Sequence, residues 1–67
     1  MTIKFNGKHE EVPEAISVAA FLEAKNIRSP HLILELNGEI LAKPEEWTNT
    51  VLNDGDALNA FSMVGGG

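Results

Sequence analysis

Apolar and polar residues alternate at the start of the chain. Thr2 to Phe5 alternate in the manner of a half-buried strand, and Lys8 to Val12 follow as a second such segment. Asn6-Gly7 stands between them. A type I′ turn requires a positive φ at both central positions, which Asn and Gly tolerate best. The pattern therefore predicts two antiparallel strands joined by a tight turn.

The spacing then changes from that of a strand to that of a helix. Pro13 ends the second strand, and Ser17 stands where a helix N-cap is expected. Asn26 tolerates a left-handed conformation, so we expect the helix to end there. One face of this helix carries three apolar side chains and the aliphatic stem of a lysine, at Val18, Phe21, Leu22 and Lys25.

The next segments repeat the hairpin chemistry. Leu32 to Leu36 are apolar except for Glu35 and predict a central strand that is buried on much of both faces. Asn37-Gly38 is a second two-residue turn signal, and it leads into a short strand from Glu39 to Leu41.

The last third of the chain predicts a helical turn and a closing strand. Lys43 to Trp47 read as a single helical turn, with Pro44 at its first position. Asn53 to Asp56 form a turn cluster, and Ala57 to Val64 form the closing strand. The predicted order is two strands, a helix, two strands, a short turn and a final strand.

One helix and four or five short strands bury one another most economically as two layers. We therefore predict the α+β class and a β-grasp arrangement, a mixed four- to five-stranded sheet with one helix packed across it. A right-handed crossover through the helix permits the first and last strands to pair in parallel at the centre. Residues 1–64 form this single domain, and residues 65–67 form a flexible C-terminal glycine tail outside it.

Composition narrows the classes of function. The chain has 67 residues, a net charge of −5 and no cysteine. The acidic balance disfavours nucleic acid, because phosphate binding requires clustered cations, and it suits either a basic protein partner or solubility alone. The absence of cysteine excludes a disulfide framework and a thiol nucleophile. Because the chain shows neither a signal peptide nor a membrane-spanning run, we expect a cytoplasmic protein that does not contact membranes.

Half of the six glycines are the last three residues, Gly65, Gly66 and Gly67. A packed domain does not need glycine there, and a frayed terminus is one explanation. Alternatively, three extended residues reach about 10 Å from the domain. Without Cβ atoms such a tail passes through a slot that excludes larger side chains, so it can deliver the Gly67 carboxylate into the active site of a partner.

A free carboxylate must be activated before it can donate its acyl group. ATP can supply the activation if the Gly67 carboxylate attacks the α-phosphate in a partner enzyme, and a sulfur nucleophile can then displace the adenylate. The sequence shows no magnesium site, phosphate-cradling loop or base for this step. We therefore expect a protein substrate rather than an enzyme, with no bound cofactor and with ATP used by the partner.

The element order, the Asn53 to Asp56 turn, the closing strand and the Gly-Gly end together resemble the ThiS family of sulfur carriers in thiamine biosynthesis. The stretch from Pro44 to Trp47 is also similar to members of that family, and the resemblance covers nearly the whole chain. It implies a ubiquitin-like fold, adenylation of Gly67 by an E1-like adenylyltransferase, and conversion of Gly67 to a thiocarboxylate. It further implies a sulfur donor protein and delivery of sulfur to a thiazole synthase.

Three other functions remain open at this point. The MoaD carriers of molybdopterin synthesis share the Gly-Gly end, although they resemble a somewhat longer chain. A ubiquitin-like modifier is disfavoured, because Gly65 stands where ubiquitin has a large basic residue that its activating enzyme reads. The last alternative is a binding module with an inert tail.

The closing strand supplies candidate docking residues. A period of two places Leu58 and Ala60 toward the helix and places Phe61 and Met63 on the outer face of the sheet. Exposed apolar groups often mark docking surfaces, so we predict that Phe61 and Met63 contact the partner. The alternative is a register shifted by one residue, with Phe61 in the core.

The remaining chemistry-bearing residues favour structural roles. His9 and His31 are far apart in sequence and have no cysteine beside them, so we expect no metal site. Glu45 and Glu46 are adjacent and do not face each other on a helical turn, which indicates solvated charge rather than an acid and base pair. Trp47 is expected to cover the edge of the core, with its indole N–H bonded to a carbonyl.

Overall fold

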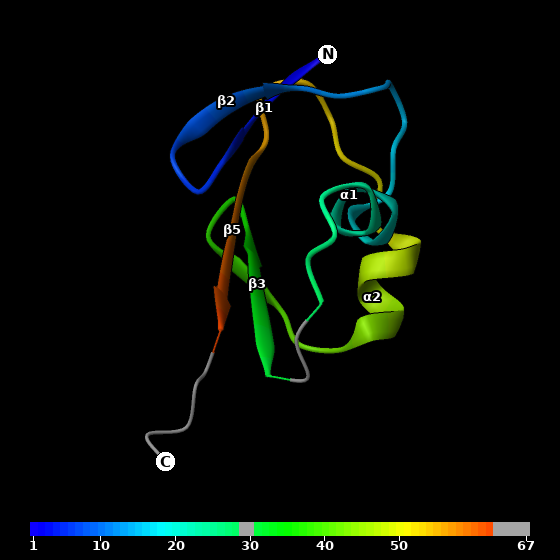
Figure 1. Cartoon of the computed structure of the whole chain (residues 1–67), viewed down its shortest axis with the longest axis vertical. Helices are drawn as coiled ribbons and strands as arrows, with labels where there is room; N and C mark the ends of the chain where they lie inside the picture. The colour runs from blue at the N-terminus through cyan, green and yellow to red at the C-terminus, as the bar shows by residue number, and fades with distance from the viewer. Residues whose placement is uncertain (29–30, 63–67) are drawn as a thin grey trace.

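Residues 1–28 and 31–62 are described by the computed structural model, in which five strands form one sheet and two helices pack against it (Figure 1). The strands lie in the order β2-β1-β5-β3-β4. The predicted α+β class and β-grasp arrangement are confirmed. Along the chain the elements are β1 (Thr2–Phe5), β2 (Lys8–Glu11), α1 (Val18–Ala24), β3 (Leu32–Leu36), β4 (Glu39–Leu41), α2 (Pro44–Asn49) and β5 (Ala57–Ser62).

Both predicted hairpins form around their Asn-Gly pairs. Asn6 and Gly7 have φ values of 50° and 84°, and Asn37 and Gly38 have values of 51° and 88°. These are the left-handed conformations that the type I′ turn requires. β1 pairs with β2 and β3 pairs with β4, both in antiparallel register.

Local capping determines where α1 begins and ends. The Ser17 hydroxyl oxygen accepts a hydrogen bond of 3.0 Å from the backbone N–H of Ala20, as a helix N-cap does. Asn26 has a φ of 57°, so the chain leaves the helix through the left-handed conformation expected there. The predicted N-cap is therefore confirmed, and the helix ends at Ala24, two residues before the predicted end at Asn26.

Parallel pairing of β1 with β5 joins the two ends of the described chain. Lys4 lies opposite Ala57 and Phe5 opposite Leu58. Beyond the last rung, the side-chain carbonyl of Asn6 accepts a hydrogen bond of 2.8 Å from the backbone N–H of Ala60, which extends the ladder past the end of β1. The predicted pairing of the first and last strands is thus confirmed.

The expectation for residues 32–36 was partly wrong. β3 has neighbours on both sides, but β5 is the central strand, and on β3 only Leu34 is fully buried. The reason is that α1 and α2 lie on the same side of the sheet, so the side chains of β3 are covered on one face only (Figure 1). An apolar run in a two-layer fold does not require burial on both faces.

The segment after β4 is longer than the single helical turn that the sequence predicts. α2 has six residues and begins at Pro44. The Glu46 carboxylate accepts a hydrogen bond of 3.1 Å from the backbone N–H of Lys43, which holds the first turn. Trp47 is half-buried at the edge of the core, and its indole N–H donates to the carbonyl of Leu41 at 2.9 Å, as expected.

The turn before β5 is held by side chains from distant parts of the sequence. The Asp56 carboxylate accepts hydrogen bonds from the backbone N–H of Asn53 at 2.7 Å and from the side chain of Asn37 at 3.0 Å. The Asp54 carboxylate accepts from the backbone N–H of Thr2 at 2.9 Å. These bonds fix the point at which β5 enters the sheet, and so the register of its side chains.

The core lies between the sheet and the helices. Its aromatic pair is Phe5 on β1 and Phe21 on α1, whose ring centroids lie 5.0 Å apart in an edge-to-face arrangement. The Lys25 ammonium lies over both rings, at 5.9 and 6.0 Å, and pairs with Glu10 at 2.6 Å. The buried side chains are Ile3, Phe5, Val12, Val18, Phe21, Leu22, Leu34, Leu52 and Leu58.

Replacing Leu58 by alanine is expected to destabilise the domain severely. The side chain is fully buried on the central strand, so the substitution leaves a cavity and costs about 2–5 kcal/mol in the free energy of unfolding. Ile40→Ala is the matched control, because Ile40 is 55% exposed and its truncation should cost about 0.5 kcal/mol. Chemical denaturation measures both values. Equal losses for the two variants would contradict the two-layer arrangement.

Candidate functional site

The side chains of β5 alternate between a buried and an exposed face. Leu58 is fully buried, whereas Phe61 is 52% exposed. Ala60 packs against the core on the same side as Leu58. The sequence prediction that Leu58 and Ala60 face the helix while Phe61 faces outward is therefore confirmed, and the shifted register is excluded.

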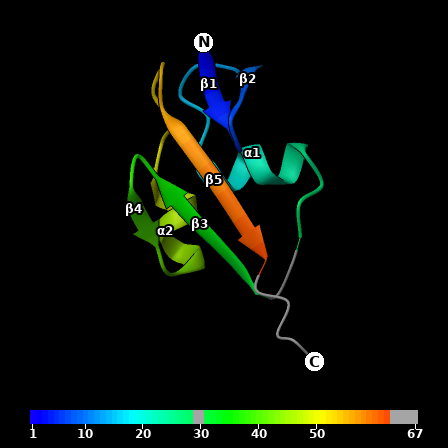
Figure 2. The ribbon, with the colours of Figure 1, turned by 90° about the vertical axis from the view of Figure 1, so that its left-hand side faces the viewer.

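The face of the sheet opposite the helices carries an apolar patch. Phe61 lies directly across from Ile33 on β3, and Ile40 on β4 is 55% exposed on the same face. Figure 2 shows this face with β5 and β3 in front of the helices. We call Ile33, Ile40 and Phe61 the outer patch. No described element covers them.

One carboxylate lies within the outer patch. Glu35 is paired across the sheet with Asn59 on one side and with Ile40 on the other. The Asn59 side-chain amide donates a hydrogen bond of 3.1 Å to one oxygen of the Glu35 carboxylate. The patch is therefore apolar at its edges and carries an oriented negative charge between them.

The described structure contains one of the site residues that the sequence singled out. Phe61 lies where β5 ends, one residue before its last residue, Ser62. Met63 and the three glycines Gly65, Gly66 and Gly67 lie outside the described residues. The predicted division of the chain at residue 64 lies there too, so it remains a prediction.

Sequence reasoning missed Ile33, Glu35 and Ile40 as members of this face. A signal was present, because a two-residue turn at Asn37-Gly38 places Glu35 directly opposite Ile40. The strand was interpreted as buried on both faces, and that interpretation concealed its exposed side.

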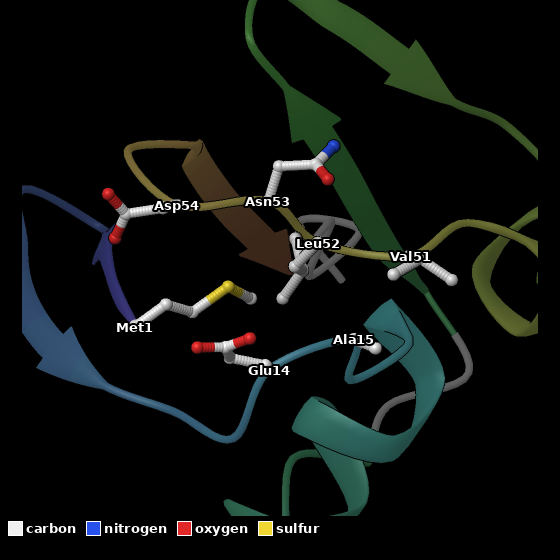
Figure 3. Close-up of a pocket in the computed structure, with 7 residues that line it drawn as sticks. All are labelled: Met1, Glu14, Ala15, Val51, Leu52, Asn53 and Asp54. Carbon is white, nitrogen blue, oxygen red and sulfur yellow. The ribbon is translucent and has the colours of Figure 1, made fainter.

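A depression of about 590 Å³ lies at the other end of the sheet, where β5 begins. Figure 3 shows its lining, with the side chain of Leu52 directed toward those of Met1 and Glu14. The Asp54 carboxylate at its rim accepts the backbone N–H of Thr2, and the terminal amine donates to the carbonyl of Val12 at 2.9 Å. Because these polar groups bond within the fold, the depression gives no indication of a bound ligand.

The described residues give two further observations. Within residues 1–28 and 31–62, no group of three or more His, Asp or Glu side chains is placed to hold a metal ion. His9 and His31 are both exposed. In the same part of the chain, neither helix has the length and apolar content that a bilayer crossing requires.

Comparison with known proteins identifies the family. The model of the ThiS family matches residues 2–67. The chain belongs to the ThiS family. The resemblance inferred from the element order, the turn and the glycine end is therefore confirmed over nearly the whole chain.

Two solved structures support the ThiS assignment. A crystal structure of the thiamine biosynthesis protein ThiS from Geobacter metallireducens is 34% identical, with a TM-score of 0.86 and full coverage of both chains. A solution structure of a thiamine biosynthesis protein from the same organism is also 34% identical. It has a TM-score of 0.78 and covers all of this chain and 88% of that one. A comparison with curated protein sequences found no match.

The ThiS likeness also agrees with the ubiquitin-like β-grasp fold predicted for the chain. In this ThiS-family chain, β5 carries Phe61 of the outer patch and is also the last strand described along the sequence.

Proposed function

We propose that this ThiS-family chain carries sulfur for thiazole formation in thiamine biosynthesis and bears the sulfur on Gly67. The observation that carries this proposal is the family match, which runs to Gly67 itself. The likeness to thiamine biosynthesis proteins of known structure over the full chain adds support. In this role the chain is a protein cosubstrate and not a catalyst.

The proposed chemistry takes place at the Gly67 carboxylate. A carboxylate oxygen attacks the α-phosphorus of ATP held by an E1-like adenylyltransferase, pyrophosphate leaves, and an acyl-adenylate forms. Sulfide released by a donor protein then attacks the acyl carbon, the bond from that carbon to the phosphate oxygen breaks, AMP leaves, and the thiocarboxylate forms. The thiazole synthase takes its sulfur from this group. The partners supply ATP, magnesium and the catalytic residues.

Chain length couples docking to this chemistry. Six residues follow Phe61 up to Gly67, so the terminal carboxylate lies at most about 20 Å along the chain from the outer patch. In an enzyme that binds the patch, the nucleotide site must therefore lie within about 20 Å of the surface that contacts Phe61. This constraint favours one partner surface that contacts both the open sheet face and the C-terminal glycines.

The chemistry of the face suits a transient protein partner. Phe61 presents half of its surface to solvent and gains burial only when another protein covers it. We propose Phe61 and Met63 as docking residues for the adenylyltransferase, with the rest of the outer patch around Phe61. Aromatic side chains near the centre of an interface commonly dominate its binding energy.

Intact-mass analysis tests the sulfur carrier role. After incubation with the cognate adenylyltransferase, ATP and a sulfur donor, the chain should gain the mass of one oxygen-to-sulfur exchange. Deletion of Gly67 should abolish this exchange, because the new terminus is retracted by about 3.5 Å from the nucleotide. The melting temperature of the deletion variant should equal that of the parent. Conjugates of higher mass would instead indicate a protein modifier, and an unchanged mass would indicate an inert module.

Phe61→Asp tests the docking role. The aspartate would bring an unpaired charge into the interface, where burial of that charge is unfavourable. Binding to the adenylyltransferase should therefore weaken by at least about tenfold. The unfolding free energy should fall by only about 1 kcal/mol, the size of one lost cross-strand pair. Val51→Asp is the matched control, because Val51 is 48% exposed and lies outside the sheet, beside the depression at its other end.

Calorimetric titration of both variants gives the comparison. Equal binding by Phe61→Asp and Val51→Asp would show that the outer patch is not the docking surface. Loss of cooperative unfolding in Phe61→Asp would show that the side chain belongs to the core.

A further inference from the structure

Glu35 occupies an unusual position for a surface carboxylate. It lies on the open face of the sheet, half-buried, with Ile40 directly across from it on β4 and Ile33 two residues before it on the same strand. Phe61 is its diagonal neighbour on β5, since Phe61 pairs with Ile33 and Asn59 pairs with Glu35. Side chains in such positions lie within about 8 Å of one another. The carboxylate is thus bordered by the whole outer patch.

The orientation of Glu35 is fixed, but its charge is not neutralised within the fold. Asn59 donates to one carboxylate oxygen at 3.1 Å. Within residues 1–28 and 31–62, no cation lies within ion-pair distance of Glu35, and the ion pairs found there join Glu10 to Lys25 and Glu23 to Arg28. Among the described residues, the second carboxylate oxygen accepts no further side-chain hydrogen bond.

Docking changes the energetics of this carboxylate. A partner that covers Phe61 and Ile40 with apolar groups also removes water from the carboxylate between them. Burial of an unpaired carboxylate is unfavourable enough to offset the gain from the apolar contacts. The cost is removed only when the partner presents a cation at that point, and a guanidinium meets a carboxylate with two parallel hydrogen bonds.

We propose that Glu35 is the specificity-determining residue of the open face, where it forms an ion pair with an arginine or lysine of the adenylyltransferase. This inference rests on the proposed function, because that function names the partner. Many proteins with an apolar surface could cover the outer patch, so apolar contact alone does not select one partner. Glu35 lowers the affinity for any protein that places no cationic side chain opposite the middle of the patch.

The other acidic residues do not share this position. Glu39 on β4 is paired with Leu36, so it lies on the side of the sheet that faces the helices. Glu11 on β2 is at the far edge of the sheet and accepts the Thr2 hydroxyl at 2.9 Å. The net charge of −5 attracts a basic partner from a distance, whereas Glu35 is the carboxylate that lies within the outer patch.

Three substitutions with one matched control test the proposal. Glu35→Gln keeps the shape and the acceptor for Asn59 but removes the charge, and Glu35→Lys reverses it. Glu39→Gln removes the same charge from the opposite face, and Phe61→Asp reports on the patch itself. The dissociation constant of each full-length variant for the adenylyltransferase is measured by calorimetry at about 0.1 M and about 1 M salt.

Binding of Glu35→Gln should weaken by at least about tenfold at the lower salt concentration, and Glu35→Lys should bind more weakly still. Glu39→Gln should change binding by less than about twofold. Glu35→Gln should also lose part of the dependence on salt that the parent shows. Glu35→Gln and Glu39→Gln should melt close to the parent temperature, because Glu35 makes no ion pair in the described structure and glutamine keeps the acceptor for Asn59.

The outcomes separate this inference from the proposed function. Suppose that the parent acquires sulfur normally and Phe61→Asp binds weakly, yet Glu35→Gln binds as well as Glu39→Gln. The role of Glu35 is then wrong and the sulfur carrier role stands. If the parent is neither bound nor adenylated, the proposed function fails, and the partner assigned to Glu35 fails with it.

Discussion

One constraint determines the rest of this structure: the described residues cover only one face of their sheet. Both helices lie on the same side, and every fully buried side chain lies between the sheet and those helices or in the loops that close that layer. A domain of this size buries only about 60% of the surface that its unfolded chain exposes. The other face is left to solvent or to another protein, and Phe61 lies on it.

The central position of β5 follows from the same constraint. Parallel pairing with β1 and antiparallel pairing with β3 hold β5 between two neighbours, and Leu58 anchors it in the core. The hydrogen bond from the backbone N–H of Ala60 to the side chain of Asn6 extends the contact between β5 and the β1 hairpin toward the C-terminal end of β5. A strand fixed in this way presents Phe61 at a defined place.

Local signals in the sequence were sufficient for most of the elements. The two Asn-Gly pairs predicted both hairpins, because two successive residues with positive φ are characteristic of the type I′ turn. Ser17 and Asn26 predicted the ends of α1 because capping is a local interaction. The alternation along residues 57–62 predicted correctly that Phe61 faces outward.

Features that depend on distant contacts were harder to predict. Leu32 to Leu36 have the composition of a strand buried on both faces, and only the placement of α2 beside α1 shows that one face is open. The extent of α2 to Asn49 was missed, because no apolar residue follows Trp47 within the helix to mark its continuation. Glu35 was read as an interruption in an apolar run. Its meaning depends on Asn59, 24 residues away.

The ThiS family assignment gives these features a common purpose. A carrier that delivers its own C-terminus needs a rigid strand leading to that end and a surface beside it that an enzyme can grip. In the function that we propose, Ile33, Ile40 and Phe61 supply apolar contact area to the enzyme, and the carboxylate of Glu35 makes that contact selective. The face of the sheet that packs against the helices stabilises the domain, and the open face remains available for contact with another protein.

We propose that the open sheet face binds the adenylyltransferase, and amide hydrogen exchange of the complex is the sharpest test of that proposal. The edge strand β4 and the exposed end of β5 should gain protection when the enzyme is added, while α1 and α2 should exchange as in the free protein. Protection confined to the helices, with β4 and β5 unchanged, would contradict it.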